Sequence, residues 1–191
     1  MTSAPRRAGS VWVALLRGVN VGGNSIVSMR ALKESFERLG FQDVRTYINS
    51  GNVLFRASGV SARALERRID RMLSRDYGLR ARTVVRSRRE MSRVVERIAR
   101  EWTPDPAWKW NVMFLRHTVD AKRALAGFEL KPGIERVVQC PGTWLWSARI
   151  RDMGRTAMMK VGKSPLYQEM TVRSVNTTKA ILSLMESAKH S

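Results

Sequence analysis

The sequence is poor in cysteine and histidine, and this excludes several kinds of site. Cys140 is the single cysteine in 191 residues, so neither a disulfide within the chain nor a cysteine-framed zinc site can form. His117 and His190 are the only histidines, and they suggest no metal-ligand spacing and no Ser/His/Asp set. Cys140 is interpreted as a small hydrophobic residue. The sequence therefore indicates no catalytic residue, metal or cofactor, and whether the chain is an enzyme stays open.

Long hydrophobic runs are also lacking. The longest, residues 11–16, is far shorter than the roughly 18 residues needed to cross a membrane. It is also too short for the apolar region of a signal peptide. We therefore expect no membrane association and a cytoplasmic location, with residues 1–10 as a flexible N-terminus.

Acidic residues are scarce relative to basic ones. Lys and Arg number 35 and Asp and Glu number 16, which gives a formal net charge of +19 and a pI of about 11.5. Residues 1–87 carry 16 basic and 6 acidic side chains, and residues 88–191 carry 19 and 10. The positive charge is thus spread over the whole chain rather than held in a basic tail.

This charge predicts attraction to polyanions, with nucleic acid as the first candidate partner. Of the basic residues 27 are Arg, which is the better bidentate phosphate ligand. An equally weighted interpretation is compositional, with Arg replacing Lys on solvated faces.

The first half shows the pattern β-α-β-β-α-β. The predicted strands are residues 11–16, 44–48, 52–56 and 80–86, and the predicted helices begin after Ser28 and Ser61 and end at Gly40 and Gly78. This order is typical of the split βαβ, or ferredoxin-like, unit. The last of these strands is expected at a sheet edge.

The second half nearly echoes the first. Ser87 and Glu90 form a capping box before a helix, followed by a strand at 111–116, a helix at 119–128 and a hairpin of residues 136–139 and 143–150. Residues 152–163 give no clear pattern, and a helix is expected from about 176 to 186. The segments VALLR and VMFLR share the pattern V-x-x-L-R, which leaves a duplication open.

The expected fold is therefore α+β, with two tightly packed ferredoxin-like halves at residues 11–87 and 88–191 whose antiparallel sheets are covered by helices. The first strand is apolar at every position from Val11 to Leu16. Both of its faces should therefore be buried. We expect the second half to cover the face that the first half leaves open.

Three segments resemble a widespread bacterial family known only as domain of unknown function sixteen ninety-seven. They are LLRGVNVGG at residues 15–23, TYINSGNVLF at 46–55 and TVRSVNT at 171–177. The resemblance covers nearly the whole chain and implies an α+β fold with ferredoxin-like halves. It implies no activity and no catalytic residues.

A glycine-rich segment joins the first strand to the first helix. Glycines there let backbone N–H groups turn toward an anion near a helix N-terminus, although a strand-to-helix turn that needs positive φ is the simpler explanation for them. The candidate anion site combines this segment with the turn after the second strand, through Arg17, Gly18, Asn20, Gly22, Gly23, Asn49, Ser50 and Asn52. The predicted strand order places the segment and the turn at opposite ends of the sheet, which counts against this site.

Lys160, Lys163 and Arg173 are candidates for a basic, phosphate-attracting surface. The two lysines lie in a segment that only loosely matches a phosphate-binding loop, and Arg173 precedes the last helix.

Three hypotheses follow for the function. The first is a noncatalytic module that binds an anionic partner, with nucleic acid favoured. The second is a small enzyme or sensor that holds a phosphorylated or carboxylated metabolite. The third is a structural or oligomerising protein whose charge only reflects composition.

Overall fold

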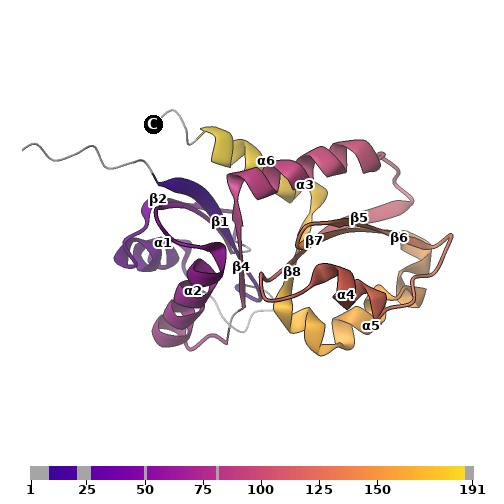
Figure 1. The fold of residues 1–191 in the computed structure, drawn as a ribbon, viewed down its shortest axis with the longest axis horizontal. Coiled ribbons are helices and arrows are strands. Elements are labelled where there is room, and N and C mark those ends of the chain that lie inside the picture. The colour runs from indigo at the N-terminus through magenta and orange to yellow at the C-terminus, as the bar shows by residue number, and fades with distance from the viewer. Residues whose placement is uncertain (1–8, 21–26, 50, 81, 188–191) are drawn as a thin grey trace, which may run out of the picture.

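The computed structural model describes residues 9–20, 27–49, 51–80 and 82–187. These residues form two four-stranded antiparallel sheets, ordered β2-β3-β1-β4 and β6-β7-β5-β8 (Figure 1). The strands are β1 Ser10–Leu16, β2 Gln42–Tyr47, β3 Asn52–Ala57, β4 Thr83–Ser87, β5 Trp108–Leu115, β6 Glu135–Cys140, β7 Thr143–Arg149 and β8 Met170–Ser174. The helices are α1 Met29–Arg38, α2 Ala62–Tyr77, α3 Arg88–Glu101, α4 Ala121–Ala126, α5 Met158–Lys163 and α6 Val175–Ser187, with short 3₁₀ helices η1 Ile150–Arg155 and η2 Pro165–Glu169. The predicted α+β fold with two similar halves is confirmed.

The strand registers repeat between the halves. Val13 of β1 pairs with Arg86 of β4, and Val112 of β5 pairs with Arg173 of β8. These two valines open the shared V-x-x-L-R segments of the sequence. Equivalent positions in the halves can therefore be compared residue by residue.

Both faces of β1 are buried, as its continuous apolar run predicts. Val13 and Leu15 belong to one core, which also contains residues of α3, α6 and the second sheet. Ala14 and Leu16 belong to another core, under α1 and α2. A third core lies on the outer side of the second sheet, under α4 and α5.

Helices α3 and α6 lie side by side and join the halves, while the edge strands β4 and β8 come together below them (Figure 1). Strand β4 leads directly into α3, and β8 leads directly into α6. The predicted capping box at the start of α3 is present, since Ser87 and Glu90 exchange hydrogen bonds with each other's backbone N–H.

Two parts of the second half differ from the sequence-based expectation. Residues 152–163, which gave no pattern, contain the end of η1 and α5, and β8 was missed because three of its five residues are polar. Thr171 and Arg173 are nevertheless buried. The apolar and polar residues alternate here, but these two polar residues are buried as well, so hydrophobicity gave no sign of a buried strand.

Candidate functional site

One face of α2 consists of arginine side chains. The helix buries apolar residues against the first sheet and leaves its opposite face exposed. Residues four apart lie one above another on a helix, so arginines at this spacing form a column. This α2 arginine face comprises Arg63, Arg67, Arg71 and Arg75, all of which are exposed.

Three members of the column, Arg63, Arg67 and Arg71, have no ion-pair partner among the described residues. Like charges four residues apart destabilise a helix. Repulsion within the column therefore destabilises the helix, and an anion bound along the column would relieve this repulsion.

The C-terminal end of the column is partly neutralised. Arg75 pairs with Asp76 at 2.6 Å, and Arg38 of α1 approaches the same carboxylate at 3.4 Å. The hydrogen bond from Arg75 is the main reason that the pKa of Asp76 is lowered. One carboxylate thus serves two guanidinium groups, and the local charge stays positive.

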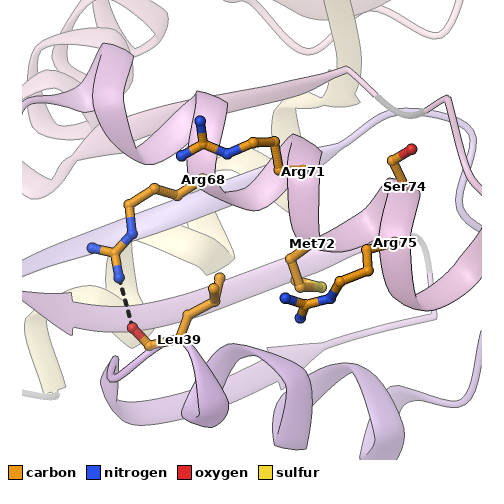
Figure 2. Close-up of a pocket in the computed structure, with 6 residues that line it drawn as sticks. All are labelled: Leu39, Arg68, Arg71, Met72, Ser74 and Arg75. Carbon is orange, nitrogen blue, oxygen red and sulfur yellow. Dashed lines mark hydrogen bonds between the residues drawn. The ribbon is translucent and has the colours of Figure 1, made fainter.

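A cleft of about 490 Å³ lies beside this face, where α2 meets the end of α1. Figure 2 shows Arg68, Arg71 and Arg75 projecting from α2 around it. Arg68 donates a hydrogen bond of 2.7 Å to the Leu39 carbonyl and lies over the Phe41 ring, 5.1 Å from its centroid. Arg68 is therefore fixed in place and extends the positive surface beyond the column.

The glycine-rich segment and the Asn49 turn lie at the same end of the sheet, so the expectation of opposite ends is wrong. Both β1 and β2 run antiparallel to β3, which lies between them, and so they point in the same direction. Asn20 joins their ends, since its Nδ2 donates to the Asn49 carbonyl at 3.1 Å. Gly22, Gly23 and Ser50 lie outside the described residues.

The side chains of two asparagines of this predicted site, Asn20 and Asn52, form hydrogen bonds within the protein. The Asn20 side chain also donates to the Val27 carbonyl and accepts from its N–H. Asn52 is fully buried and donates to the Tyr47 carbonyl, while its Oδ1 accepts from Arg173. The structure thus assigns Asn20 and Asn52 to holding the turn, and leaves Arg17 and Gly18 beside an open space.

Arg173 does not belong to a basic surface, and this expectation is wrong. Only 8% of the residue is exposed, and its guanidinium donates to five oxygens: Asn52 Oδ1, Thr171 Oγ1 and the carbonyls of Leu16, Gly51 and Val172. Burial lowers the pKa of Arg173 to about 10, so it stays charged at neutral pH. Lys160 and Lys163 are exposed on α5, and their role in anion attraction stays a prediction.

Arg86 is the equivalent of Arg173 in the first half, and sequence reasoning missed it. It is 1% exposed and donates to the carbonyls of Val85, Leu115 and Gly142. Burial also lowers its pKa. The signal was the repeated V-R-S at residues 85–87 and 172–174, each directly before a helix.

A buried charge network surrounds Arg116 where the halves meet. Its guanidinium lies 3.4 Å from Glu169 and 3.9 Å from Glu66, and it also donates to Asp70. Desolvation raises the pKa of Glu66, which is fully buried. Among the described residues, no three His, Cys, Asp or Glu side chains are grouped so as to hold a metal ion.

The two repeated halves define a class of α+β protein, and comparison with known proteins then places the chain more closely. The profile described as "Protein of unknown function (DUF1697)" matches residues 10–146. The chain therefore belongs to this family, as the resemblance of its motifs indicated. No curated protein matches the sequence.

One solved structure supports the fold over nearly the whole chain. It is that of the conserved bacterial protein SP0830 from Streptococcus pneumoniae, which is 25% identical. The match has a TM-score of 0.79 and covers 92% of this chain and 98% of the other. Within the described residues, no helix is both long and apolar enough to cross a membrane.

Proposed function

We propose that the protein binds nucleic acid through the α2 arginine face. The supporting observation is that Arg63, Arg67 and Arg71 are exposed in one column and that no described residue supplies a carboxylate to them. A nucleic acid provides negative charge at regular spacing and releases its condensed counterions when arginines replace them.

The dimensions of the column suit this role. Successive arginines are about 6 Å apart along the helix axis, and the four span about 18 Å. Duplex DNA carries one charge for about every 1.7 Å of its axis. Several phosphates therefore lie within reach of the column at once, and each guanidinium can bind phosphate oxygens in a bidentate manner.

The chemistry of this face favours contacts to the backbone of the nucleic acid. The exposed residues of α2 include no aromatic side chain on which a base could stack. Phosphate contacts position a protein but carry no sequence information. The proposed activity is therefore binding with little dependence on base sequence.

The test compares two variants with equal loss of charge. Arg67→Gln with Arg71→Gln removes two members of the column, whereas Arg100→Gln with Arg123→Gln removes two exposed arginines of α3 and α4. Anisotropy of labelled duplex DNA and single-stranded RNA should show about fivefold or greater weakening for the first variant. The second should change the affinity much less.

Two results would contradict the proposal. Equal weakening by both variants would mean that attraction is diffuse and follows net charge alone. Absence of binding by the unmodified protein at low salt would exclude nucleic acid as the partner and favour a structural or oligomerising role.

A further inference from the structure

A second positive site lies where the end of β1 meets the start of β8. It is a pocket of about 240 Å³, called here the Arg17 pocket, lined by Arg17, Gly18, Tyr167, Met170, Thr171, Val172 and Arg173. Two arginines thus line one small space, and the lining contains no acidic residue.

Arg17 is held in a fixed position at the rim of this pocket. Its guanidinium lies over the Tyr167 ring, 4.7 Å from the centroid, and donates one hydrogen bond of 2.9 Å to Gln168 Oε1. A guanidinium has five N–H donors, and within the described residues the others of Arg17 have no acceptor. Arg17 therefore presents ordered donors to a ligand.

Arg173 contributes charge rather than hydrogen bonds. Its guanidinium nitrogens already donate to protein oxygens. A buried positive charge in a medium of low polarity attracts an anion more strongly than the same charge in water. The wall of the pocket is therefore electropositive, while binding contacts come from Arg17.

The second half has an arginine at the equivalent position, and there the arginine is paired with carboxylates. Arg116 follows Leu115 at the end of β5, as Arg17 follows Leu16 at the end of β1. The Arg116 guanidinium is surrounded by the carboxylates of Glu66, Asp70 and Glu169. Arg17 forms no ion pair with any described residue, and residues 21–26, which follow in the sequence but lie outside the described residues, contain no acidic side chain.

We infer that the Arg17 pocket binds a small oxyanion, through a phosphate or carboxylate group that takes the place of the carboxylates around Arg116. Phosphate and carboxylate share the paired oxygens that match the guanidinium fork. The volume is below the usual range of about 300–1,000 Å³ for sites that take drug-sized ligands. The occupant is therefore an inorganic ion or a small metabolite, and this site is separate from the proposed nucleic-acid face.

The experiment titrates ¹⁵N-labelled protein with inorganic phosphate and, separately, with acetate, at constant ionic strength. Saturable shifts at Gly18, Tyr167 and the Arg17 side chain are expected with at least one of the two ions. The comparison of the ions distinguishes a phosphate site from a carboxylate site. Arg17→Gln should weaken binding about tenfold or more, and Arg17→Lys should weaken it less, because lysine keeps the charge but loses the fork.

The control is Arg71→Gln, which removes one equal charge from the α2 arginine face. It should leave phosphate and acetate binding within about twofold, whereas Arg17→Gln should leave DNA binding nearly unchanged. Thermal melting without ligand checks that both variants fold. Shifts that do not saturate with either ion, or equal losses from Arg17→Gln and Arg71→Gln, would overturn the inference without affecting the proposed nucleic-acid binding.

Discussion

Arg86 and Arg173 each donate to the backbone carbonyl that ends the central strand of the other half. Arg86 of β4 bonds to Leu115 of β5, and Arg173 of β8 bonds to Leu16 of β1. Each also reaches the glycine carbonyl of the adjoining hairpin, Gly142 or Gly51. This reciprocal exchange fastens the two halves together by buried, charged hydrogen bonds.

Arg173→Gln should lower the free energy of unfolding by about 2–4 kcal/mol. The shorter amide would leave several buried carbonyls without a donor, and an unsatisfied buried polar group costs about 1–3 kcal/mol. Urea unfolding monitored by tryptophan fluorescence measures the change. Arg71→Gln, on the exposed face of α2, is the matched control and should change stability by no more than about 0.5 kcal/mol. Equal effects would show that Arg173 does not brace the halves.

Gly142→Ala should be more destabilising than Gly133→Ala by about 1–3 kcal/mol. Both glycines have positive φ, so both substitutions carry backbone strain. A Cβ at Gly142 would lie 2.9 Å from Arg86 Nη2, whereas a Cβ at Gly133 would lie in open space. The additional loss of stability in Gly142→Ala therefore measures the displacement of Arg86 from its carbonyl acceptors. Thermal or urea unfolding of the pair checks this, and equal losses would count against it.

The free energy of unfolding of the Glu66→Gln variant, relative to that of the unmodified protein, should increase as the pH rises from about 4. Desolvation raises the pKa of Glu66 above the ordinary value of 4.5 for glutamate, so the folded state holds this proton more tightly than the unfolded state. Its contribution to stability is present below the unfolded pKa and is lost as pH rises through the folded pKa. The amide lacks this dependence. Urea unfolding between pH 4 and about 7 gives the difference, and a difference that falls with pH would contradict the assignment.

Cys140 should react slowly with iodoacetamide in the folded protein. The thiolate is the reactive form, and burial is the main cause that raises the pKa of this half-buried thiol. We expect alkylation at pH 8 to be about tenfold or more slower than in urea-unfolded protein. Equal rates in the two states would show that Cys140 is not shielded.

The sequence predicted those features of the fold that depend on apolar pattern and turn chemistry. The run from Val11 to Leu16 predicted a strand buried on both faces, and the structure places alternate residues in two different cores. The capping box at Ser87 was equally readable because its two residues are close in the chain. Strand β8 was not, because the partners that make burial of Arg173 possible include Leu16 and Asn52, which are far away in the sequence.

For the candidate sites too, local sequence patterns were predictive, whereas contacts between distant residues were not. Arg17 directly follows the strand predicted at residues 11–16, and in the structure it lines an open pocket. The role of Arg173 depends on Leu16 and Asn52, more than 100 residues away, so no local pattern could distinguish it from a surface arginine. The column on α2 was not predicted, although its four-residue spacing is visible in the sequence. Its lack of ion-pair partners among the described residues became visible only in the folded chain.

The most direct test of the proposed function is the salt dependence of DNA binding by the unmodified protein and by the triple variant Arg63→Gln, Arg67→Gln and Arg71→Gln. Each lost phosphate contact should reduce the slope of log K against log salt concentration by about 0.9. We therefore expect the slope of the triple variant to be less steep by about 2–3, with weaker binding at every salt concentration. An unchanged slope would show that these arginines do not contact phosphates and would contradict the proposal.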